Sequence, residues 1–189
     1  MTISGGRSIK RIAKERGMHV FGNFLIGFRN DDVVSGIAID KTPTSTYFWT
    51  FVLPVYDENT FLHMSLGERI SVGEEGATNL SQAYEVYLQK LAHVKSPCDL
   101  VKYIDQRGLS GDYAGWVKYI SLIRLGDFSM AKHALGALIG LPISKVLRER
   151  IGRMNSALLV GGEAGAQQLL DEWSVVTGRL LGSAPQGGG

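Results

Sequence analysis

A change of hydrophobic period in the middle of this 189-residue chain constrains its fold more than any other feature. In residues 24–66 apolar side chains recur at every second position, which is the period of a β-strand. Beyond residue 78 they recur at every third or fourth position, which is the period of an amphipathic helix. We therefore predict an α+β protein with a sheet in its first half and an all-helical C-terminal half.

The first half is expected to place an N-terminal helix on an antiparallel β-meander. Residues 7–16 predict the helix, because their apolar side chains share one face and Gly17 is well placed to end it. The third strand is apolar on both faces, and Pro54 indicates that it reaches a sheet edge or a bulge near its end. Alternation predicts four strands, at residues 24–28, 33–39, 47–56 and 60–66.

The second half is expected to contain only helices. Ser96 and Pro97 supply an N-cap and a first-turn proline for a helix that Gly108 stops, and Asp112 can cap the next helix. The glycine-rich run 161–165 is expected to connect the last two helices. Helical periodicity covers residues 84–91, 97–107, 112–126, 128–139, 143–158 and 164–181. The chain thus divides into a sheet region, a helical region and a disordered tail, at residues 1–76, 77–182 and 183–189.

Composition argues against several classes of function. A formal charge of +2 lacks the basic excess of a protein that neutralises many phosphates, so nucleic acid is the less favoured partner. Cys98 is the only cysteine, which leaves no internal disulfide or thiolate metal cluster and favours a cytoplasmic setting. No window approaches 18 uninterrupted apolar residues, so we expect no membrane span. The four histidines lack the spacing of metal ligands, and we expect no metal and no cofactor.

The stretch SLIRLGDFSMAKHALGAL, residues 121–138, predicts two helices joined by a tight turn. Gly126 lies at the turn, Ala131 opens the packed face of the second helix, and Pro142 closes the unit. This pattern resembles one hairpin of the tetratricopeptide kind, although Trp116 is out of register with the tryptophan of that pattern. Because such hairpins hold other proteins, the resemblance implies a protein-binding role.

A second resemblance covers residues 48–70, FWTFVLPVYDENTFLHMSLGERI. This stretch combines an aromatic strand, a Leu-Pro-x-Tyr step at 53–56 and a Ser-x-Gly-x-Arg ending at 65–69. It is similar to a pattern in uncharacterised bacterial α+β proteins, some of whose relatives lie beside toxin or phage-defence genes. The resemblance implies a bacterial cytosolic protein. We predict a non-enzymatic protein-binding or assembly module, with an immunity or phage-defence accessory role as the specific hypothesis.

Large aromatic side chains are the candidate anchors for a protein partner. Such side chains bury much area on binding at little cost in rotamer entropy. Two of the candidates lie on the aromatic strand and two open the first helix of the hairpin. They are Tyr47, Trp49, Tyr113 and Trp116.

A candidate polar edge lies at the end of the predicted fourth strand. Alternation would place His63 and Ser65 on the same face of that strand. Arg69 could then reach back to Glu68, to Asp57 or to a ligand. This edge is the basis of an alternative function, a metal-dependent nuclease or another enzyme that uses the sheet edge.

The nuclease hypothesis also draws on four residues that are close in sequence. Asp31, Asp32, Asp40 and Lys41 are the residue types that hold a divalent cation and poise a lysine near the attacking water. Adjacent residues of a strand point to opposite faces, however, so Asp40 and Lys41 do not suit one site. Asp31 and Asp32 suit a solvated hairpin turn better.

Two basic stretches complete the candidates. The helix at residues 7–16 carries five positive side chains, which suit a phosphate or an acidic protein. The other stretch consists of Lys145, Arg148, Arg150 and Arg153. Neither has interleaved aromatic residues, and both are predicted to be solvated outer faces of helices.

Overall fold

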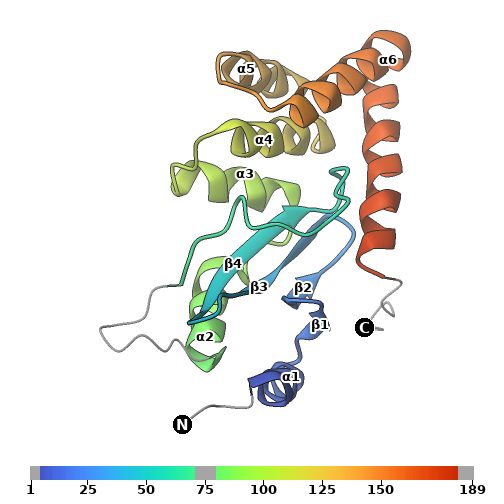
Figure 1. Cartoon of the computed structure of the whole chain (residues 1–189). Coiled ribbons are helices and arrows are strands. Elements are labelled where there is room, and N and C mark those ends of the chain that lie inside the picture. The colour runs from blue at the N-terminus through green and yellow to red at the C-terminus, as the bar shows by residue number, and fades with distance from the viewer. Residues whose placement is uncertain (1–4, 71–79, 183–189) are drawn as a thin grey trace. The chain divides into compact units, whose positions relative to one another are not determined.

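A computed structural model describes residues 5–70 and 80–182 of the chain. It confirms the α+β class: an N-terminal helix precedes a four-stranded antiparallel sheet, and helices follow through the C-terminal half (Figure 1). The strands are β1 (His19–Phe21), β2 (Phe24–Arg29), β3 (Val33–Lys41) and β4 (Thr46–Pro54). The helices are α1 (Gly5–Glu15), α2 (Leu80–Leu91), α3 (Pro97–Gln106), α4 (Asp112–Arg124), α5 (Phe128–Ile139) and α6 (Lys145–Leu180).

The chain forms two compact units that interleave in sequence. The first, the sheet unit, comprises Met1–Leu53 and Leu62–Lys95. The second, the helical unit, comprises Pro54–Phe61 and Ser96–Gly189. Helix α2 therefore belongs with the sheet, whereas the loop that follows β4 belongs with the helices. The boundary expected near residue 76 and the tail expected from residue 183 both lie outside the described residues.

Within the sheet unit the strands follow the order β1-β2-β3-β4. The register of β2 against β3 shifts between Ile26 and Phe28, which places a bulge at Gly27. Tyr87 of α2 covers this bulge, and a Cβ atom added at Gly27 would lie 2.7 Å from its ring. The Tyr87 hydroxyl also lies 3.3 Å from the Ser35 hydroxyl on β3. Glycine at position 27 thus allows the close approach of α2 to the sheet.

The prediction of a strand at residues 60–66 is wrong. The buried leucines of this segment, Leu62 and Leu66, are four residues apart, whereas Phe61 is 64% exposed, so burial does not alternate as it does in a strand. The structure instead has a first strand at His19–Phe21 that the sequence did not predict, because three residues are too short to show a period.

The residues that come after this irregular segment pair with the edge of β4 through main-chain hydrogen bonds. The amide of Thr50 donates to the carbonyl of Glu68 at 3.0 Å, and the amide of Ile70 donates to the carbonyl of Phe48 at 2.8 Å. A Cβ atom at Gly67 would lie 1.7 Å from the Thr50 carbonyl oxygen, so only glycine fits there. Pairing of this kind covers part of the exposed edge of β4.

The predicted cap of α3 is confirmed, and α5 begins with a side-chain cap of the same kind. Ser96 caps α3 by accepting from the amide of Asp99 at 3.2 Å, and Asp127 caps α5 by accepting from the amide of Met130 at 3.0 Å. Helices α4 and α5 form the expected hairpin, and Ala131 is 2% exposed. A small side chain at that position lets the two helices approach closely.

Two helical details differ from the prediction. Gly111, not Asp112, holds the N-cap position of α4, and the Asp112 carboxylate instead accepts from the amide of Ser144 at 3.1 Å. In α2 the apolar residues Tyr84, Leu88 and Leu91 were predicted to share one packed stripe, but Leu88 is 38% exposed. The residues that α2 buries are Leu80, Ala83, Tyr87 and Leu91.

The last two predicted helices are the arms of α6, which bends sharply at Gly162. That residue has φ 59° and ψ −148°, a conformation open essentially to glycine alone. A Cβ atom at Gly165 would lie 2.6 Å from the carbonyl oxygen of Ala157, so the bend requires a second glycine. We call residues 159–163 the α6 elbow. None of the described helices, α6 included, is long and apolar enough to cross a membrane.

Candidate protein-interaction surface

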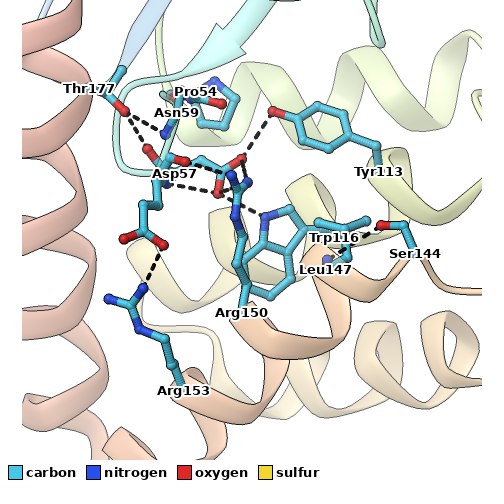
Figure 2. Close-up of polar contacts among 11 residues, drawn as sticks. Pro54, Asp57, Asn59, Tyr113, Trp116, Ser144, Leu147, Arg150, Arg153 and Thr177 are labelled. Atoms are coloured by element: carbon cyan, nitrogen blue, oxygen red, sulfur yellow. Dashed lines mark hydrogen bonds and ion pairs between the residues drawn. The ribbon is translucent and has the colours of Figure 1, made fainter. Parts of the chain in front are cut away.

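A buried carboxylate ties the loop after β4 to the helical unit (Figure 2). Asp57 is 0% exposed, and its two carboxylate oxygens accept from Nη1 of Arg150 at 2.8 and 2.9 Å. The indole N–H of Trp116 and the hydroxyl of Tyr113 also donate to this carboxylate, at 3.0 and 3.1 Å. The Asp57 carboxylate therefore has hydrogen-bond donors from α4 and from the first arm of α6.

The main chain of the same loop holds the second arm of α6. The hydroxyl of Thr177 donates to the carbonyl of Asp57 and accepts from the amide of Asn59 at 2.9 Å. The side-chain amide of Asn59 in turn donates to the carbonyl of Pro54 at 3.0 Å. Because Arg150 precedes the elbow and Thr177 follows it, this loop fastens both arms of α6.

Burial determines the electrostatics of this cluster. Loss of solvent raises the pKa of the Asp57 carboxyl above its usual value, while the Arg150 guanidinium and the donors from Trp116 and Tyr113 act to lower it. Burial and the nearby carboxylate raise the pKa of the Tyr113 hydroxyl well above its usual value. A carboxylate so enclosed and so fully hydrogen-bonded holds structure together, and its geometry does not suit it to contact a substrate.

Part of the second basic stretch is not a solvated outer face, which corrects the prediction. The side chain of Arg150 is only 14% exposed because it pairs with Asp57, and Arg153 pairs with Glu58 at 2.5 Å. The residue spacing explains the error, since the acidic partners lie 93 and 95 positions earlier and leave no local pattern.

The helical unit carries an apolar groove beside α5. The groove has a volume of about 410 Å³ and lies between α5, the end of α3 and the start of α4. Its polar side chains include the ion pair of Asp105 with Lys118, at 2.6 Å, and His133. Most of its side chains are apolar, among them Ile104, Leu109, Ala114, Met130, Ala137 and Leu141. We call it the α5 groove.

Helix α5 itself is much more apolar than its burial explains. Its sequence FSMAKHALGALI contains one lysine and one histidine, yet only Ala131 and Leu138 are buried. Met130 is 49% exposed and Ile139 is 59% exposed. Such a helix is normally covered on most of its circumference. Among the described residues, α5 therefore keeps an apolar face that is largely uncovered.

The aromatic candidates of β4 lie together with Arg69. Tyr47 and Trp49 are half-buried, and the Arg69 guanidinium stacks 3.8 Å from the centre of the Tyr47 ring. Trp49 bridges Arg69 through the main chain, and its indole N–H is buried without a hydrogen-bond partner among the described residues. Arg69 thus lies against an aromatic ring, while Glu68 pairs with Lys90.

The rest of the predicted polar edge is not a strand face. His63 and Ser65 lie in the irregular segment, where the Ser65 amide lies 3.5 Å from Nδ1 of His63. The prediction that His63 and Ser65 share one face of a strand is therefore wrong. Asp57, the other expected partner of Arg69, is paired with Arg150 instead.

The two aromatic candidates on α4 both contact Asp57. Tyr113 is half-buried and Trp116 is 0% exposed. The Trp116 ring also packs against Trp173 with ring centres 5.8 Å apart. Partner binding by the four aromatic residues stays a prediction, and among them Trp116 is the one fully enclosed in this conformation.

The residues of the nuclease hypothesis lie apart. Asp31 and Asp32 lie in the connection before β3, whereas Asp40 and Lys41 end that strand. The seven residues of β3 that precede Asp40, at about 3.3 Å per residue, separate the two pairs. Within residues 5–70 and 80–182, no group of three or more His, Cys, Asp or Glu residues is placed to hold a metal ion.

The fold and these contacts define an α+β protein with a helical unit that presents an apolar groove. No family model, no curated protein and no solved structure matches the chain.

The sequence analysis missed two groups of residues. The partners of Asp57 lie far along the chain, and no local pattern links them. The exposed face of α5 left a signal that could have been used, because a helix with so few charged residues predicts a surface that needs a cover.

Proposed function

We propose that this protein is a non-enzymatic protein-binding or assembly module and that the α5 groove is its docking surface. The observation that carries the proposal is the mismatch between the apolar sequence of α5 and the burial of only two of its residues. Exposed apolar area of this kind is the usual mark of an interaction site on a folded domain.

The energetics favour a partner that covers this face. Burial of apolar surface contributes roughly 25 cal/mol per Å², so enclosing large side chains such as Met130 and Ile139 supplies a central part of the binding free energy. The groove is already formed, which keeps the ordering cost of binding low.

The groove also defines the chemistry of its partner. The charges of Asp105 and Lys118 neutralise each other within the lining, and the remaining surface is mainly aliphatic. His133 adds one polar group: its Nδ1 lies 2.9 Å from the carbonyl oxygen of Ser129. Since that carbonyl only accepts, Nδ1 is the donor of this hydrogen bond. The matching partner is an apolar protein segment, of the kind that lays one side of a helix into a groove.

The cellular setting of this module is proposed from the sequence resemblances. The stretch at residues 48–70 and the single helix hairpin support a bacterial cytosolic protein with an accessory role in immunity or phage defence. This setting needs no catalytic residue, cofactor or metal, and it requires only that the helical unit hold another protein.

Binding assays with a charged groove variant test the proposal. Ala137→Glu places a carboxylate on an exposed groove position, so it should leave the fold intact and abolish protein contacts made by the groove. Val175→Glu, at a 52% exposed position of α6 outside the groove lining, is the matched control. Chemical cross-linking followed by mass spectrometry in host extract measures both. Identical cross-links in the wild type and Ala137→Glu would reject the α5 groove as the docking surface.

A further inference from the structure

We propose that the occupant of the α5 groove is a second copy of this chain, which inserts its α6 elbow into the groove. This inference rests on the proposed function and names the partner of the same surface. It follows from an apolar knob and an apolar groove in one helical unit, together with complementary charges beside them.

The elbow displays the most exposed large apolar side chains of the described residues. Leu159 is 87% exposed and Val160 is 91% exposed. They are adjacent in sequence, immediately before the bend that Gly162 and Gly165 make possible. The bend, which depends on two glycines, therefore presents these two apolar side chains together on a convex surface, and we call the pair the knob. A single exposed apolar side chain would need no explanation, whereas an adjacent pair does.

The knob and the groove lie at opposite ends of the helical unit. In Figure 1 the connection from α3 to α4, which lines the groove, lies at the left of the stacked helices, and the elbow lies at the upper right. One chain therefore cannot fill its own groove with its own elbow. A second copy can, and the pair then keeps one free elbow and one free groove, which lie on different copies. Contacts of this head-to-tail kind build a ring or an open filament.

Charge complementarity supports this occupant. Glu163 is the last residue of the elbow and is exposed, and within the described residues no ion pair engages it. Lys132 lies on α5 beside the groove residue His133, and it is likewise exposed and unpaired there. The other lysine at the groove, Lys118, already pairs with Asp105. An inserted elbow would thus bring an acidic residue to the one described lysine of α5.

Sedimentation velocity of the full chain over a wide concentration range tests the contact. The wild type should associate with rising concentration, to masses beyond a dimer because the contact is heterologous. Val160→Asp should remain a monomer throughout, since it places a charge on the knob at a position too exposed to affect folding. Val175→Asp, on the other arm of α6, should associate as the wild type does. A wild type that stays monomeric, or a Val160→Asp variant that still associates, would overturn the proposal.

A charge exchange tests the orientation of the contact. Glu163→Lys and Lys132→Glu should each raise the concentration needed for half association, by about fivefold, because each places like charges side by side. The double variant restores opposite charges and should return to the wild-type value. Association of the double variant that is weaker than that of both single variants would contradict this pairing.

The outcomes also separate this inference from the proposed function. A monomeric wild type whose cross-links to another protein disappear in Ala137→Glu would reject self-association and keep the groove as a docking surface. Ala137→Glu that loses neither self-association nor cross-links would reject both.

Discussion

Asp57 is the residue on which the polar contacts of the helical unit most depend. Asp57→Ala should lower the free energy of unfolding by about 3–5 kcal/mol, because it leaves the Arg150 guanidinium buried without its counter-charge. Glu58→Ala removes the neighbouring pair with Arg153, which is partly exposed, and should cost less than about 1 kcal/mol. Urea denaturation monitored by circular dichroism measures both.

The same measurement on a double variant distinguishes the charge pair from its packing. Asp57→Leu combined with Arg150→Met removes both charges and should recover a large part of the stability lost in Asp57→Ala. The reason is that the free energy needed to desolvate a buried ion pair is nearly as large as the attraction between its charges. Equal losses for Asp57→Ala and Glu58→Ala would show that Asp57 is not buried as described.

Tyr119 presents the opposite case, a buried polar group without a partner. The ring is 2% exposed and its hydroxyl has no hydrogen-bond partner among the described residues. Tyr119→Phe should therefore leave stability unchanged or raise it by about 1 kcal/mol. Tyr56→Phe is the matched control and should destabilise by about 1 kcal/mol, because the Tyr56 hydroxyl bonds the buried Ser121 at 2.7 Å. The midpoint of thermal unfolding should therefore be higher for Tyr119→Phe than for Tyr56→Phe.

The hydroxyl of Tyr119 also predicts a dependence of stability on alkaline pH. Burial raises its pKa from 10 to about 12, so the folded protein keeps this proton at a pH where the unfolded chain has lost it. Its contribution is therefore fully present below about pH 10 and is lost as the pH rises towards 12. Tyr119→Phe should lose less stability than the wild type between these values. Parallel stability curves for the two proteins would contradict the assigned burial.

At the scale of elements, prediction from sequence succeeded where the deciding contacts are local. Ser96 bonds an amide only three residues away, so a capping pattern was sufficient to place the start of α3. The segment at residues 60–66 failed because its course is determined by the close approach of Gly67 to Thr50, across 17 positions of the chain. An alternating run of residues carries no information about such a contact.

The elbow of α6 is the element whose geometry a single substitution tests best. Gly162→Ala should destabilise by about 1–3 kcal/mol, because a side chain is strained at φ 59° and ψ −148°. The adjacent Gly161 is helical with open space around it, so Gly161→Ala should stabilise by about 0.5–1 kcal/mol. Thermal unfolding of both variants measures the difference. If Gly162→Ala is as stable as Gly161→Ala, α6 is not bent at that residue.

At the scale of the whole molecule, the two units interleave in a way that the sequence conceals. The change of hydrophobic period suggested a boundary between two consecutive regions, yet the loop 54–61 belongs to the helical unit although β4 precedes it. Contacts from Asp57 to Arg150 and Thr177 span 93 and 120 positions, and nothing in the local pattern of either partner indicates the other. The cluster around Asp57 was therefore harder to predict than the fold class or the exposed face of α5, because it depends on how distant segments come together.

This interleaving predicts that the helical half does not fold alone. A fragment of residues 96–182 lacks Asp57, and the buried donors of Arg150, Trp116 and Thr177 would lose their acceptors. Each orphaned donor costs about 1–3 kcal/mol, and together these losses rival the 5–15 kcal/mol that stabilises a typical domain. Calorimetry of the fragment should therefore show no cooperative transition. Joining residues 54–61 to its N-terminus through a long glycine-serine linker should restore a transition, and the same linked chain with Asp57→Ala should lose most of that gain. A bare fragment that melts cooperatively at the temperature of the full chain would show that the loop is dispensable.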